Sequence, residues 1–142
     1  MTKPSLVYVN TIAASPEKVW QALTDPVFTQ RYWYGTRVES DWQVGSPITF
    51  VKAPGMGDPD TGRVLVADRP KKLAFSWHIA WGPMAKEKDS RVTFTIEPNG
   101  AGSKLTLVHD EFEEGSAAAE ALKNGWPAIL AGLKKTLESS AS

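Results

Sequence analysis

The stretch Leu122–Leu137, with the sequence LKNGWPAILAGLKKTL, decides the fold of this chain. Its large apolar residues recur at intervals of three and four, which places them on one face of an α-helix. We predict one long C-terminal helix that follows Gly115 and ends near Glu138. The residues of its apolar face are Leu122, Trp126, Ile129, Leu130, Leu133 and Leu137.

Pro127 interrupts this pattern. A proline inside a helix lacks the N–H that would bond to the carbonyl four residues earlier, here that of Lys123, and its ring clashes with that carbonyl. We therefore expect the helix to kink or restart between Lys123 and Trp126, beside the flexible pair Asn124-Gly125.

Upstream of the helix, the sequence alternates apolar and polar residues in short runs separated by turn residues. This pattern predicts antiparallel strands joined by hairpins. Ala53–Thr61 and Ala80–Asp89 are rich in turn formers or lack alternation, and we expect both to be long loops. The predicted strands are Thr36–Ser40, Pro47–Lys52, Gly62–Asp68, Lys72–Ile79, Arg91–Glu97 and Lys104–Phe112.

The N-terminal part begins with a strand at Leu6–Ala13, which also alternates. Ser15 is a suitable N-cap, and Pro16 suits the first position of a helix because its missing N–H is not needed there. Asp25-Pro26 ends this helix, and a second short helix follows at about Val27–Tyr32.

Together these elements predict an α+β fold. An antiparallel sheet of about six to seven strands wraps around the long C-terminal helix, and two short helices follow the first strand. A strongly twisted sheet cannot seal flat against one helix, so we expect a cavity between them. The length fits a single domain over residues 1–142 with its core at about 5–138.

The composition excludes several classes of function. Lys and Arg together number 16, as do Asp and Glu, so there is no basic excess for binding nucleic acid. The absence of cysteine excludes disulfides and thiolate sites. No run of apolar residues is long enough to span a membrane, and residues 1–25 do not resemble a secretory signal. We therefore expect a cytoplasmic protein.

Several strings in this order resemble the START/Bet v 1-like (SRPBCC) superfamily, and within it the family named after the activator of Hsp90 ATPase. They are ASPEKVWQALTDP (14–26), GSPITF (45–50), DRPKKLAFSW (68–77), TLVHDEF (106–112) and GWPAILAGL (125–133). The resemblance implies a helix-grip fold with a cavity for a ligand, and it links the chain to stress response. The cochaperone that gives the family its name carries an additional N-terminal domain. We expect no such domain here, and therefore little activation of Hsp90.

The candidate ligand contacts follow from strand parity, helix face and position. Trp81 and Met84 lie in the second long loop, where we expect them to form a pliable lid. The side chains expected to line the cavity are Trp33, Phe50, Trp77, Ile79, Trp81, Met84, Phe94, Leu107, His109, Trp126, Ile129 and Leu130.

His109 is the most suggestive of these residues, because it shares parity with Leu105 and Leu107 and so faces the core. Three roles remain open for its imidazole: a buried group satisfied by the protein, a polar anchor for a ligand, or a general acid or base. A metal site would need both histidines together with carboxylates, but His78 has the opposite parity from its apolar neighbours and points away from the core. We therefore expect no metal site. We expect no other cofactor either. Gly55–Gly57 predicts a flexible loop that could also form a pocket lip.

Three functions from different classes agree with these features. The favoured prediction is the binding of an apolar or aromatic small molecule between the sheet and the C-terminal helix, without self-contained catalysis. An interaction module of the cochaperone type, with a chaperone as partner, is the second. An enzyme of the cyclase or aromatase type is the third, and would need several polar groups converging in the cavity.

Overall fold

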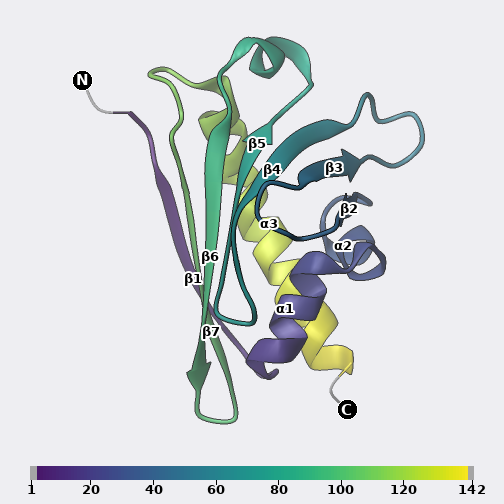
Figure 1. The fold of residues 1–142 in the computed structure, drawn as a ribbon, viewed down its shortest axis with the longest axis vertical. Coiled ribbons are helices and arrows are strands. Elements are labelled where there is room, and N and C mark those ends of the chain that lie inside the picture. The colour runs from purple at the N-terminus through teal and green to yellow at the C-terminus, as the bar shows by residue number, and fades with distance from the viewer. Residues whose placement is uncertain (1–2, 141–142) are drawn as a thin grey trace.

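The computed structural model describes residues 3–140 and confirms the predicted α+β helix-grip fold. Seven strands form one antiparallel sheet in the order β1-β7-β6-β5-β4-β3-β2, and the helices pack against it (Figure 1). The elements are β1 (Leu6–Ile12), α1 (Pro16–Thr24), α2 (Pro26–Tyr32), β2 (Arg37–Ser40), β3 (Pro47–Val51), β4 (Asp60–Asp68), β5 (Lys72–His78), the 3-10 helix η1 (Gly82–Lys86), β6 (Ser90–Asn99), β7 (Gly102–Asp110) and α3 (Ala117–Ser140).

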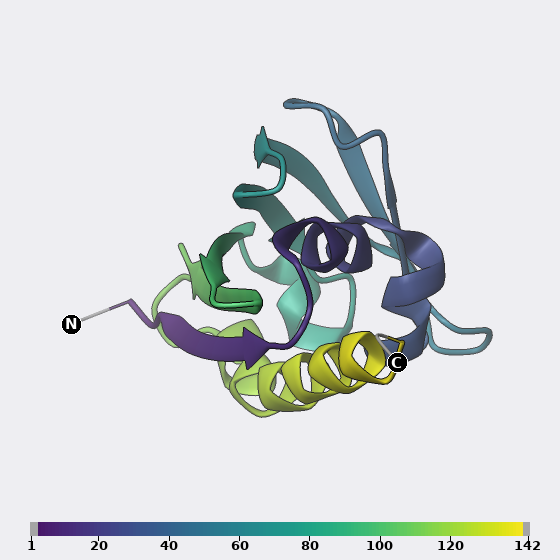
Figure 2. The same cartoon turned by 90° about the horizontal axis from the view of Figure 1, so that it is seen from below.

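The C-terminal helix α3 runs along the edge strand β1 (Figure 2). Hydrogen bonds hold the helix to this strand and to the residue after it: Asn10 Nδ2 donates to the carbonyl of Leu130 over 3.1 Å, and the N–H of Ala13 donates to Glu138 Oε2 over 2.9 Å. These bonds and the apolar face of α3 hold the helix over the core, as the intervals of three and four in its sequence predict.

The sequence predicts that the helix kinks or restarts near Pro127. The restart is wrong, because the helix is uninterrupted from Ala117 to Ser140, and the kink of its axis stays a prediction. The structure shows what replaces the missing bond. The hydroxyl of Tyr8, from β1, donates to the carbonyl of Lys123 over 3.2 Å, and this is the carbonyl that Pro127 leaves without its N–H. A partner from another element therefore satisfies the helix where the sequence alone indicated a break.

The two short helices are capped as predicted. Ser15 Oγ accepts the N–H of Lys18 at the start of α1, and Asp25 Oδ1 accepts the N–H of Val27 at the start of α2. Helix α2 then packs closely on α3 at Gly132, where an added Cβ would lie 3.1 Å from the Cβ of Tyr32. The close contact positions the segment that follows α2 beside the face of α3.

Several strand limits differ from the predictions, and for two of them the structure gives the physical reason. Strand β4 begins at Asp60, inside the predicted loop, because the backbone there already pairs with Phe50 of β3. Strand β7 ends at Asp110 rather than Phe112, because Glu111 has a φ of 63° and turns the chain out of the sheet. The predicted loop 80–89 contains the short helix η1.

Candidate functional site

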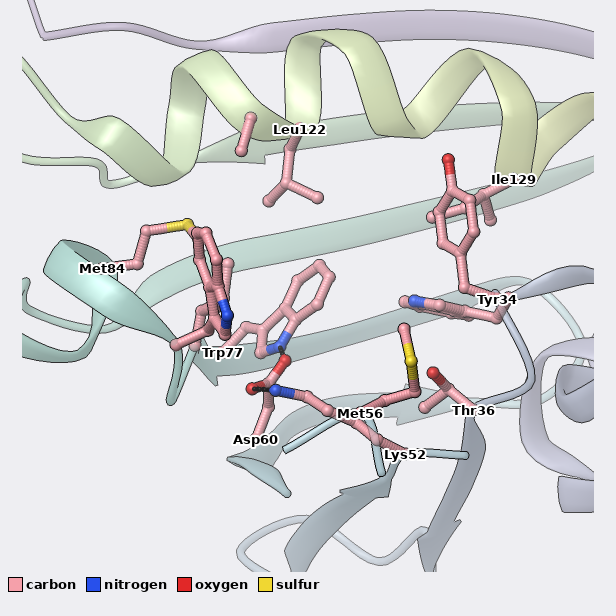
Figure 3. A pocket seen from close by; sticks show the side chains of 13 residues that line it. Tyr34, Thr36, Lys52, Met56, Asp60, Trp77, Met84, Leu122 and Ile129 are labelled. Carbon is pink, nitrogen blue, oxygen red and sulfur yellow. Dashed lines mark hydrogen bonds and ion pairs between the residues drawn. The ribbon is translucent and has the colours of Figure 1, made fainter. Parts of the chain in front are cut away.

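A pocket of about 300 Å³ opens where the sheet, α3 and three connecting segments meet (Figure 3). The sheet contributes the ends of β4 and β5, and α3 contributes its first half. The segment after α2, the loop between β3 and β4, and η1 complete the walls. The lining residues are Trp33, Tyr34, Thr36, Lys52, Met56, Asp60, Trp77, Ile79, Trp81, Met84, Ala121, Leu122 and Ile129.

Aromatic rings form the inner wall of the pocket. The ring of Trp33 lies edge-on to Trp77 and Trp126, with centroids 5.7 Å and 5.4 Å away. Trp77 also stacks on Phe50 at a centroid distance of 5.1 Å. These contacts are in the range of favourable aromatic pairs and hold the rings in fixed orientations. The pocket therefore has a rigid apolar wall on its sheet side.

The 3-10 helix η1 and the residue before it form a short lid at another side of the pocket, next to the start of α3. Met84 of η1 is buried, whereas the adjacent Trp81 is 60% exposed at the rim. Glu87 fixes this segment to the helix: its carboxylate accepts the N–H of Ala117 over 2.8 Å and the hydroxyl of Ser116. A carboxylate at a helix N-terminus is stabilised by the N–H groups and the helix dipole.

Tyr34 stands at the mouth of the pocket. Its backbone is left-handed, with a φ of 51°, and Gly35 continues the turn with a φ of 74°. Such a conformation is uncommon for a large side chain and directs the tyrosine back over α3. There its hydroxyl donates to the carbonyl of Gly125 over 3.4 Å. Tyr34 thus links the segment after α2 to the helix on one side of the opening (Figure 3).

The polar part of the pocket is an ion pair between Lys52 and Asp60. Lys52 Nζ lies 3.0 Å from Asp60 Oδ1, and the two side chains are 16% and 7% exposed. Asp60 also accepts the N–H of Ala80 over 2.8 Å and the indole N–H of Trp77 over 3.1 Å. Three donors thus satisfy this largely buried carboxylate. The pair therefore forms one polar corner in an otherwise apolar pocket.

His109 lies in the core behind the pocket and bonds only to protein groups. The indole N–H of Trp126 donates to Nδ1 over 2.9 Å, so the neutral imidazole carries its proton on Nε2. Nε2 in turn lies 2.7 Å from Ser90 Oγ, and the Ser90 hydroxyl donates to the carbonyl of Trp77. Burial lowers the pKa of His109 to about 3, and the charge of Asp110 offsets this only in part.

The structure divides the predicted ligand contacts into two groups. Those that line the pocket are Trp33, Trp77, Ile79, Trp81, Met84 and Ile129. Those that lie in the surrounding core, away from the pocket lining, are Phe50, Phe94, Leu107, His109, Trp126 and Leu130. The second group is buried as its strand parity and helix face predict, and rings pack directly against Phe94, His109 and Trp126. We do not include it in the proposed binding site.

The sequence reasoning missed the polar corner and the mouth. Lys52 directly follows β3 and Asp60 begins β4, so the loop between them, not a motif, brings the charges together. The Gly-Pro pattern of that loop was the available signal, and it does place Met56 at the pocket lip. Tyr34 follows the end of the second predicted helix, and no sequence pattern there indicated where its side chain would point.

Among residues 3–140, no group of three or more histidine or carboxylate side chains is arranged to hold a metal ion. His78 points outward, as predicted, and lies 3.5 Å from Asp89. Within the same range, no helix is both long and apolar enough to cross a bilayer.

Solved structures from several organisms have this architecture. A protein from Mesorhizobium loti is 27% identical with a TM-score of 0.81, and the match covers 96% of this chain and 98% of that one. A protein from Cytophaga hutchinsonii is 29% identical with a TM-score of 0.75, and 99% of each chain is covered. An HSP90 activator from Plasmodium falciparum is 22% identical, with a TM-score of 0.75 and coverage of 94% and 96%, which shows the fold alone.

Family membership rests on the sequence as well as on the fold. No curated protein matches the chain closely. The model of one protein family, however, matches residues 13–138, which include every element that builds the pocket. This range also contains the strings that carried the resemblance in the sequence. The chain belongs to the family described as activator of Hsp90 ATPase homolog 1-like proteins.

Proposed function

We propose that this protein binds an apolar or aromatic small molecule in the pocket between the sheet and α3. The observation that carries the proposal is the pocket itself, with a volume of about 300 Å³ and walls made mainly of tryptophan, methionine and aliphatic side chains. This volume lies at the lower end of the range for small-molecule sites. A few converging polar groups in an apolar pocket are also typical of such sites.

The proposal does not include catalysis. The candidate acid or base of the core, His109, is separated from the pocket by packed rings and holds both ring nitrogens in hydrogen bonds to protein groups. With a pKa of about 3 it stays neutral at physiological pH. The charged groups in the pocket, Lys52 and Asp60, neutralise each other. These features favour binding over the cyclase or aromatase hypothesis.

Native mass spectrometry of protein purified from its own host tests this function. We expect a species heavier than the bare chain by the mass of one small molecule, which is released on denaturation. In protein stripped of that molecule, we expect saturable uptake of a neutral fluorescent naphthylamine. A protein that carries no molecule from its host and takes up no such probe would refute the proposal.

An interaction with an Hsp90-like chaperone is a second candidate. It is supported by the family description and by the relative from Plasmodium falciparum that is itself an HSP90 activator. An apolar surface is available on the outer face of the sheet, where Val7 and Val9 of β1 are 60% and 58% exposed. A several-fold increase in ATP turnover by the host chaperone, lost on changing both valines to threonine, would support this candidate. Unchanged turnover would favour the pocket.

A further inference from the structure

The ion pair in the pocket restricts the chemistry of the ligand, and this inference rests on the proposed function. Among the residues that line the pocket, Lys52 and Asp60 are the charged ones, so the lining carries no net charge. We propose that the ligand is an uncharged molecule with an apolar body and a hydrogen-bond acceptor, such as a ketone or ester carbonyl, that bonds to Lys52.

Hydrogen-bond donors outnumber the free acceptors at the polar corner. Asp60 already accepts from three groups: the ammonium of Lys52, the backbone of Ala80 and the indole of Trp77. An ammonium group has three N–H donors, and Asp60 takes one of those of Lys52. The corner therefore has donors to spare and little acceptor capacity left, so it matches a ligand that accepts hydrogen bonds.

The charges at the polar corner disfavour a ligand that carries a charge of its own. The positive charge of Lys52 is matched by a carboxylate 3.0 Å away, and both side chains are largely shielded from water. A ligand carboxylate would place two anions around one cation in a pocket with apolar walls, where charges are poorly solvated. A carbonyl oxygen accepts the same N–H without adding a charge. The corner therefore favours a neutral acceptor over an acid of the same shape.

The polar corner lies across the pocket from the apolar residues of α3. Lys52 and Asp60 lie at one side of the pocket, while Leu122 and Ile129 of α3 lie on the other (Figure 3). A molecule that reaches from one side to the other places its apolar part against α3 and the tryptophan wall. Its acceptor then points to Lys52. The hydroxyl of Thr36 lies on the same side of the pocket and is a second polar contact.

Three naphthalene derivatives with one substituent at the same ring position test the inference: a methyl ketone, an isopropyl hydrocarbon and a carboxylate. Binding is measured by titration, with the indole N–H signal of Trp77 followed by NMR because this group bonds to Asp60 beside the ligand. We expect the ketone to bind about tenfold more tightly than the hydrocarbon, the effect of one hydrogen bond. The carboxylate should bind least tightly.

Two variants connect this preference to the ion pair. Lys52→Met should remove the advantage of the ketone, because the hydrogen bond to its carbonyl is lost. The affinity for the hydrocarbon, which makes no such bond, should stay within about twofold. Asp60→Asn leaves the positive charge of Lys52 unmatched, so carboxylate affinity should rise about tenfold. Lys135→Met, an exposed change outside the pocket, is the control. Lys52→Leu, which also removes the donor, serves if the methionine variant does not fold.

The outcomes separate this inference from the proposed function. If all three compounds bind and the ketone has no advantage, or if the wild-type protein prefers the carboxylate, the inference is wrong while the pocket remains a binding site. If the ketone advantage persists in both Lys52 variants, the acceptor is not at this corner and the inference is also wrong. If none of the compounds binds, both proposals fail.

Discussion

The indole N–H of Trp126 donates a hydrogen bond to Nδ1 of His109 over 2.9 Å. This contact joins α3 to β7 in the centre of the core and fixes the tautomer of the imidazole. The other ring nitrogen, Nε2, bonds to Ser90 Oγ, so both nitrogens of the imidazole already have partners in the protein. Among the roles left open by the sequence, the structure favours the buried group that the protein itself satisfies.

The buried histidine makes stability depend on pH. Its pKa is lowered from 6.5 to about 3 in the folded protein, so between these values the unfolded chain binds a proton that the native state does not. The stability that neutral His109 contributes is therefore present above pH 6.5 and is lost as the pH is lowered toward 3. From pH 7 to pH 5 we expect a loss of about 2 kcal/mol in the free energy of unfolding, measured with urea.

His109→Gln is the control, since an amide keeps a donor and an acceptor but does not titrate. Its free energy of unfolding should change less over the same pH range, whatever its absolute stability. Equal pH dependence in the two proteins would show that other groups are responsible.

The hydroxyl of Tyr8 should matter mainly because of Pro127. In the wild-type protein Tyr8→Phe leaves the carbonyl of Lys123 without its partner, and we expect a cost of about 1 kcal/mol. In the Pro127→Ala background the N–H of residue 127 can bond to that carbonyl, so the cost should fall by half or more. A double-mutant cycle from urea unfolding measures this coupling. Equal costs in the two backgrounds would contradict the compensation.

Glu87 should stabilise both the lid and the start of α3. Glu87→Ala removes the acceptor for the N–H of Ala117 and the hydroxyl of Ser116, and we expect a loss of about 1–2 kcal/mol. Glu114 is exposed and lies just before α3 in the sequence, so Glu114→Ala should have almost no effect on stability. Chemical denaturation of both variants tests this. A similar loss in each would mean that the general negative charge, not the cap, is what stabilises the helix.

The sequence was sufficient for the architecture because local patterns and the fold agree. Alternation identified the inward face of each strand, so Phe94 and Leu107 are buried as predicted. Ser15 and Asp25 marked the helix starts through a chemistry that operates within three residues. Such signals depend only on residues that are near in the chain, so a single sequence is enough to recognise them.

The site was less predictable because it depends on contacts between distant segments. Parity shows which way Trp126 and His109 face, but not whether space remains in front of them; the rings of Trp33 and Trp77 fill it. The bond from Tyr8 that supports α3 joins residues 115 positions apart. The Lys52–Asp60 pair is closer in the chain, but it forms only because the loop between β3 and β4 turns the backbone so that the two strands pair.

Titration of a neutral naphthylamine probe into pocket-blocked protein tests the central claim most directly. Ala121 lines the pocket from an exposed position on α3, so Ala121→Trp adds a large side chain there without disturbing the core. Ala131→Trp adds the same side chain to an exposed position of α3 outside this pocket. Circular dichroism verifies that both variants are folded.

If the pocket is the binding site, the wild-type protein and Ala131→Trp should bind one probe with similar affinity. Ala121→Trp should bind at least about tenfold more weakly, since the space that the ligand needs is occupied. Unchanged binding by folded Ala121→Trp would contradict the account, because the probe would then bind elsewhere.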